Sequence, residues 1–121
     1  MRRRNPQAAL ADYEAILRFE PSNAMAFQSR GAALLLMGQA GPAVASFTEA
    51  LSLGVEEPHR VYYNRGQARE VLGDLRGAME DYSTALEIQP DWGPANEELA
   101  RFVRSRRDQL AAYLDDAEAT P

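Results

Sequence analysis

The stretch Phe27-Gln28-Ser29-Arg30-Gly31 returns 35 residues later as Tyr62-Tyr63-Asn64-Arg65-Gly66, and this recurrence decides the fold. Further pairs keep the same offset and order: Gly38/Gly73, Ala43/Ala78, Phe47/Tyr82, Ala50/Ala85 and Leu53/Ile88. A third, partial copy lies 34 residues upstream, where Ala9, Tyr13, Ile16 and Phe19 precede Ala43, Phe47, Ala50 and Leu53. Self-similarity at a fixed period of this size is typical of a stacked array of one supersecondary unit.

Each unit is predicted to be two helices joined by a glycine turn. Gly38 and Gly73 fall at a helix C-terminus, where glycine adopts a left-handed conformation at little cost. The next helix carries apolar residues at i, i+4 and i+7, which is the stripe of an amphipathic helix: Ala43, Phe47, Ala50 and again Ala78, Tyr82, Ala85. Helix caps are expected at Asn5-Pro6, Gly41-Pro42 and Asp74.

The predicted fold class is all-α, an α-solenoid of stacked antiparallel helix hairpins. Six helices are expected, near residues 6–19, 24–37, 42–53, 60–72, 75–88 and 94–116. They form one domain over residues 1–121, with a half repeat (second helix only) at 5–22, full repeats at 24–58 and 59–92, and a C-terminal capping helix at 93–117. The interval between Val55 and Tyr62 contains one residue more than the repeat requires, so the loop over 55–60 is expected to bulge.

At these residues the chain resembles the tetratricopeptide repeat family, over roughly residues 5 to 105. The small-and-aromatic signature of that family is matched by Phe27, Gly31, Ala43, Phe47 and Ala50, and again by Tyr62, Gly66, Ala78, Tyr82, Ala85 and Pro90. Arg30 and Arg65 depart from it, because that position often holds leucine. The resemblance implies a right-handed superhelix that serves as a protein-binding scaffold.

The resemblance also implies a concave groove lined by the first helix of each hairpin. Carried over position by position, the groove residues are Met25, Gln28, Ala32, Leu35, Arg60, Tyr63, Asn64, Gln67, Glu70, Glu97, Arg101 and Arg104. Such a channel suits a peptide or helix of a partner protein, with Tyr63 as a rigid contact and the arginines pairing with carboxylates. The alternative is that several of these residues are ordinary solvated helix surface. A clamp for chaperone tails is not expected, because the family builds it with lysines and this chain has none.

A rival function is a structural element that self-assembles into a homo-oligomer through its two ends. The first helix is expected to leave an apolar edge bare, with Leu10, Tyr13 and Leu17 as a docking seam for another helix. The last helix would add Leu110, Tyr113 and Leu114 as a second contact surface. The simpler reading of the first edge is a frayed end exposed to solvent.

Composition argues against most other function classes. The net charge of −5 disfavours nucleic acid as the main partner, and no apolar run approaches the ~20 residues that span a bilayer. The chain has no cysteine, and its one histidine, His59, has no nucleophile beside it in the sequence. We therefore predict no catalytic residues, no metal and no cofactor, and a cytoplasmic protein that is not an enzyme.

Overall fold

The computed structural model describes residues 5–119, except that the side chains of residues 106, 110, 113, 114 and 116–119 in the last helix lie outside the described part. Six helices lie within residues 5–119: α1 (Pro6–Phe19), α2 (Ala24–Leu36), α3 (Ala40–Leu53), α4 (Pro58–Val71), α5 (Leu75–Ile88) and α6 (Gly93–Ala119). No strand occurs among these residues. The predicted all-α class is confirmed, and the predicted helix ends agree with the observed ones to within three residues.

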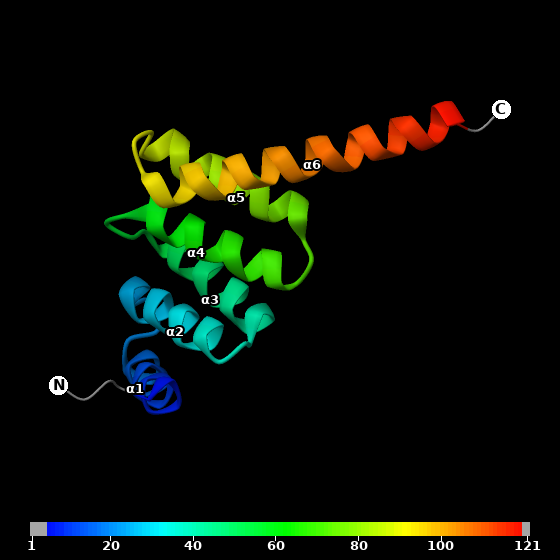
Figure 1. Ribbon diagram of the computed structural model, residues 1–121. Helices are drawn as coiled ribbons and strands as arrows, with labels where there is room; N and C mark the ends of the chain where they lie inside the picture. Colours follow the sequence, from blue (N-terminus) through cyan, green and yellow to red (C-terminus); the bar gives the residue numbers. More distant parts are fainter. Residues whose placement is uncertain (1–4, 120–121) are drawn as a thin grey trace.

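The helices form a stack in which each one packs against the next along the chain (Figure 1). The first helix, α1, lies at one end of this stack, and α5 with α6 lies at the other. The two complete hairpins are α2 with α3 and α4 with α5. In addition, α2 contacts α4, so the first helices of these two hairpins meet directly. The predicted solenoid of stacked hairpins is thereby confirmed, whereas the division into repeats at particular residues remains a prediction.

Glycine turns close the first helix of each hairpin, as predicted. Gly38 and Gly73 have φ angles of +77° and +81°. The amide nitrogen of Gly38 donates to the Leu35 carbonyl at 3.0 Å, and that of Gln39 donates to the Leu34 carbonyl at 2.8 Å. These two bonds satisfy the last carbonyls of α2 within a short turn. For this reason α3 already begins at Ala40, and the predicted cap at Gly41-Pro42 is wrong.

The other helix starts follow ordinary capping chemistry. Asn5 and Asp74 accept hydrogen bonds from the amides of the first helical turn, as expected, and Asn23 does the same for α2. Pro58 occupies the first position of α4, which suits its fixed φ angle. Because the helix starts there, the connection between α3 and α4 covers only residues 54–57, and the bulge predicted over 55–60 is shorter than expected.

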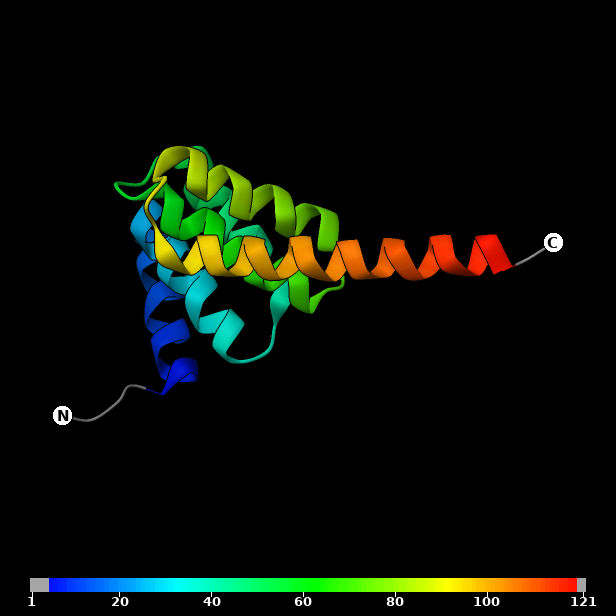
Figure 2. The ribbon, with the colours of Figure 1, turned by 45° about the horizontal axis from the view of Figure 1, so that its top comes forward.

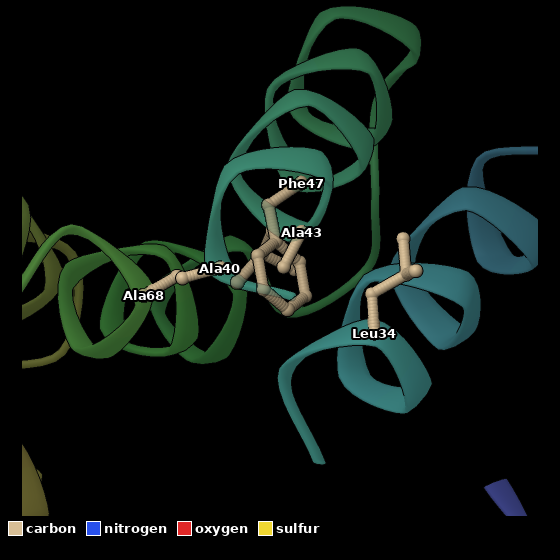
Figure 3. Close-up of a cluster of buried hydrophobic side chains, with 6 residues drawn as sticks. Leu34, Ala40, Ala43, Phe47 and Ala68 are labelled. Atoms are coloured by element: carbon tan, nitrogen blue, oxygen red, sulfur yellow. The ribbon is translucent and has the colours of Figure 1, made fainter. Parts of the chain in front are cut away.

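The core consists of aromatic rings inserted against glycines. Phe47 of α3 and Tyr82 of α5 are fully buried. A Cβ atom on Gly31 would lie 2.6 Å from the Phe47 ring, and one on Gly66 would lie 2.7 Å from the Tyr82 ring. Figure 3 shows the Phe47 ring on α3 between α2 and α4. The small residues of the repeat are therefore required by the close approach of a ring to the preceding helix.

The repeated arginines tie the two helices of each hairpin together. Arg30 donates from Nη1 to the Ser46 hydroxyl at 2.7 Å. Arg65 holds the buried Asp81 carboxylate through two bonds, from Nε at 2.9 Å and from Nη2 at 2.7 Å. Arg69 donates to the same carboxylate at 3.0 Å. The arginines that stand in place of leucine at these positions thus form a polar link between the two helices of each hairpin.

The last helix, α6, has 27 residues and is about 40 Å long at 1.5 Å per residue. Its first half packs on α5, where Phe102 is buried against Tyr82 with ring centroids 5.7 Å apart. Its second half extends beyond the stack (Figure 2). Neither this helix nor any other within residues 5–119 combines the length and the apolar character needed to cross a bilayer.

Candidate functional site

The predicted groove residues fall on α2, α4 and the first half of α6, and the structure brings some of them into direct contact. Arg101 of α6 donates from Nη2 to Glu70 of α4 at 2.7 Å and to Glu98 at 2.6 Å. Glu70 also accepts a bond from the Tyr82 hydroxyl at 2.9 Å. Glu70 therefore links the core of the second complete hairpin to the surface between α4 and α6.

A hollow of about 410 Å³ lies between α4 and α6 at this point, and we call it the α4–α6 hollow. Its lining residues are Gln67, Glu70, Val71, Glu98 and Arg101. Three of the five belong to the groove set expected from the sequence, whereas Val71 and Glu98 were not in it. The hollow offers an apolar side chain beside two carboxylates and one guanidinium group.

An aromatic cluster lies along the same helices, towards the start of α4. Trp92, in the loop before α6, packs edge-on against Tyr63 and against His59, with ring centroids 4.9 and 5.1 Å apart. Arg60 lies over the Trp92 ring at 5.9 Å, and Gln67 donates to the Tyr63 hydroxyl at 3.2 Å. His59, the second residue of α4, is half-buried beside the indole of Trp92.

The arginines expected to receive partner carboxylates are largely engaged within the chain. Arg60 pairs with Glu57 at 2.7 Å, and Arg101 pairs with Glu70 and Glu98. The bonds to Glu98 and then to Glu70 raise the pKa of Arg101 above its ordinary value. These two side chains thus already have carboxylate partners within the chain, and their pairing with a partner's carboxylates remains a prediction. Arg104 and Glu97 are exposed on α6, and Asn64 is half-buried on α4.

Electrostatics between α4 and α6 are dominated by carboxylates. Partial burial raises the pKa of the Tyr63 hydroxyl, and so do the charges of Glu98, Glu97 and Glu70, in that order. Arg101 lowers it by a smaller amount. The Tyr63 hydroxyl therefore experiences a net negative surrounding, which favours its neutral form.

Three of the four predicted groove residues of α2 line hollows, and they lie in two different ones. Met25 and Gln28 line a hollow of about 220 Å³ together with Glu56 and Glu57 of the loop before α4. Ala32 lines another of about 260 Å³, between α1 and α2, with Pro6, Ala9, Tyr13 and Leu36 among its other residues. Leu35 is half-buried against the core. The twelve predicted groove residues are thus spread over several surfaces of the stack.

Sequence reasoning missed one pair of exposed apolar residues. Leu36 and Val71 are 78% and 66% exposed, although both are large and apolar. They are separated by 35 residues, directly before the glycine turns, so they hold equivalent places at the ends of α2 and α4. The sequence contained an indication of this exposed pair, because both copies of the repeat carry an apolar residue at this position. The repeat pattern assigns that residue no place in the packing between helices.

The seam predicted at the N-terminal edge is partly buried, and its role as a docking surface remains a prediction. Leu10, Tyr13 and Leu17 are half-buried, and Leu10 packs against the core. Ile16 is 38% exposed and Phe19 is 87% exposed. The side chains of Leu110, Tyr113 and Leu114, the predicted second contact surface, lie outside the described residues. Within the described part, no group of three His, Cys, Asp or Glu residues is placed to hold a metal ion.

Comparison with known proteins gives a consistent pattern. A family model described as "Tetratricopeptide repeat" matches residues 59–91. Serine/threonine-protein phosphatase 5 of Rattus norvegicus is 27% identical over 111 residues, which is 89% of this chain and 22% of that protein. The chain thus spans about a fifth of the length of this relative.

Solved structures agree with the fold. The first such repeat domain of Spaghetti (RPAP3), bound to the HSP90 peptide SRMEEVD, superposes with a TM-score of 0.79 and 24% identity over 84% of this chain and 80% of that one. The second domain of human RPAP3, in complex with the HSP70 peptide SGPTIEEVD, gives 0.74 and 27% identity over 80% of each chain.

Proposed function

The chain belongs to the tetratricopeptide repeat family, and on that premise we propose that it is a protein-interaction module that binds a peptide segment of a partner protein along α2, α4 and the first half of α6. The proposal is for a binding role and involves no catalytic residue. The two RPAP3 domains support it, because each holds a peptide in its solved structure.

The observation that carries the proposal is the exposed pair Leu36 and Val71. Two large apolar side chains at equivalent ends of α2 and α4 are more exposed than their type usually is. Each lines a hollow, between α1 and α2 for Leu36 and between α4 and α6 for Val71. An extended segment crossing the first helices of the hairpins would cover both, and the aromatic cluster at Trp92 would give it a rigid contact.

The proposal is tested by selecting short peptides from a displayed random library with the wild-type chain. Affinities are then measured by fluorescence titration, for which Trp92 is a suitable reporter because it is the only tryptophan. Leu36→Asp combined with Val71→Asp is expected to weaken the selected peptides at least about tenfold, because two desolvated apolar contacts are lost.

Leu72→Asp is the matched control. Leu72 is also exposed, but it does not line the α4–α6 hollow beside Val71. Its substitution is expected to leave the affinity unchanged, with circular dichroism showing that both variants remain folded. Equal affinities of the wild type and the double variant for the peptide would contradict the proposal that the peptide binds at Leu36 and Val71.

A second candidate, self-association with a second copy of the chain, is favoured by the incomplete cover of α1. The repeated positions are fully buried in α3 (Ala43, Phe47, Ala50) and in α5 (Ala78, Tyr82, Ala85). In α1, Tyr13 is only half-buried and Ile16 is exposed. The sequence ends are also opposite in charge, with Arg2, Arg3 and Arg4 at one and Asp115, Asp116 and Glu118 at the other.

Self-association predicts a molar mass that rises with protein concentration without any added peptide. Ile16→Glu is expected to return the mass to that of a monomer, because a charge would be placed on the uncovered edge. Ile16 is a better position for this substitution than Leu10, because Leu10 packs against the core and a glutamate there would also lower stability. A monomeric mass for the wild type at all concentrations in light scattering would rule this candidate out.

A further inference from the structure

We propose that the α4–α6 hollow selects a partner segment bearing lysine or arginine, and that it disfavours an acidic tail. This inference rests on the proposed peptide-binding function and adds the charge of the partner to it. The cation of the hollow is engaged within the chain, its carboxylates are in excess, and its apolar surface suits a cationic side chain.

The one guanidinium group that lines the hollow, that of Arg101, has its donors directed at the chain's own carboxylates. Arg101 donates from Nη2 to Glu70 at 2.7 Å and to Glu98 at 2.6 Å, and from Nε to Glu98 at 3.1 Å. Arg60, at the start of α4 and outside the hollow, is likewise paired, with Glu57. A carboxylate from a partner would have to displace one of these charge-assisted bonds, which are the strong ones among protein hydrogen bonds.

Carboxylates outnumber cations in the hollow and next to it. Glu70 and Glu98 line it with one guanidinium group, that of Arg101, whereas Glu97 and Arg104 are both exposed on α6 and are not among its lining residues. Glu97 is exposed beside Glu98, and its charge acts on the Tyr63 hydroxyl with the same sign as those of Glu70 and Glu98. A cationic side chain entering here meets a complementary field, whereas an acidic one is repelled.

The non-polar surfaces of the site also match a long cationic side chain. Val71 lines the hollow and is largely exposed, so the alkyl part of a lysine or arginine can cover it while the charged head reaches Glu70 or Glu98. Outside the hollow, towards the start of α4, the indole of Trp92 already accepts a cation, because Arg60 lies over it at 5.9 Å. The hollow thus offers an apolar surface and carboxylates together to one long cationic side chain.

The experiment analyses the peptides that the wild-type chain selects from the random library. We expect enrichment of lysine and arginine and depletion of aspartate and glutamate, and we expect the acidic peptide SRMEEVD to bind more weakly than the best selected peptide. Glu97→Lys should lower the affinity for that selected peptide roughly fivefold, as expected for a reversed exposed charge.

Glu49→Lys, which makes the same change of net charge at an exposed site on α3, is the control and should have no such effect. Selection of acidic peptides would overturn the inference and leave the groove intact. Failure to select any peptide would remove the proposed function itself. An equal loss in Glu49→Lys and Glu97→Lys would assign the preference to the overall charge of the chain, and would also overturn the inference.

Discussion

Replacing Gly66 with valine is expected to lower the free energy of unfolding by about 3 kcal/mol, at the upper end for overpacked cores. A Cβ at this position would lie 2.7 Å from Tyr82 Cε1 and 3.0 Å from Cδ1. The ring cannot move away easily, because Tyr82 is fully buried and its hydroxyl is bonded to Glu70. Urea denaturation followed by circular dichroism measures the loss.

Gly41→Val provides the matched control for this substitution. Gly41 is also helical, but a Cβ there has no atom within 4 Å and its φ is not positive. Its substitution should therefore change the stability by no more than about 1 kcal/mol, as expected from helix propensity. A similar small change in both variants would show that the close approach of ring and glycine does not constrain the stack.

The second large effect is expected at Asp81, whose side chain is only 3% exposed. Asp81→Ser should lower the free energy of unfolding by about 3 kcal/mol, because Arg65 and Arg69 lose their shared buried carboxylate. The first complete hairpin shows how the loss can be offset. There the positions equivalent to Arg69 and Asp81 are Leu34 and Ser46, and Arg30 bonds to Ser46.

The double variant Arg69→Leu with Asp81→Ser copies that arrangement into the second complete hairpin. It should recover most of the stability, to within about 1 kcal/mol of the wild type, since substitutions of contacting residues are not additive. Urea denaturation of the four proteins completes the thermodynamic cycle. A double variant as unstable as the sum of the single changes would show that the two hairpins do not use interchangeable polar links.

The helices and their turns could be predicted because they depend on local signals that recur. Gly38 and Gly73 mark the turns, and the paired Gly31/Phe47 and Gly66/Tyr82 mark the packing between helices. The role of Arg30 and Arg65 was missed, although the sequence contained the clue. Ser46 and Asp81, their partners, lie at the same offset of 35 residues and change together with Leu34 and Arg69.

The candidate site was only partly predictable, because its contacts join residues far apart in the chain. Helix spacing pairs Arg101 with Glu97, whereas the structure pairs it with Glu98 and with Glu70, 31 residues away. That second contact depends on how α6 lies across α4. Trp92 was missed for a related reason, since it stands in a loop with no aromatic counterpart one repeat earlier.

The central claim is that α2, α4 and the first half of α6 form the surface that binds a partner peptide. The most direct test is a nuclear magnetic resonance titration of the labelled chain with the best selected peptide. We predict that backbone amide shifts change around Leu36, Val71 and Trp92 and along the first half of α6. Shift changes confined to α3 and α5, on the second helices of the hairpins, would contradict it.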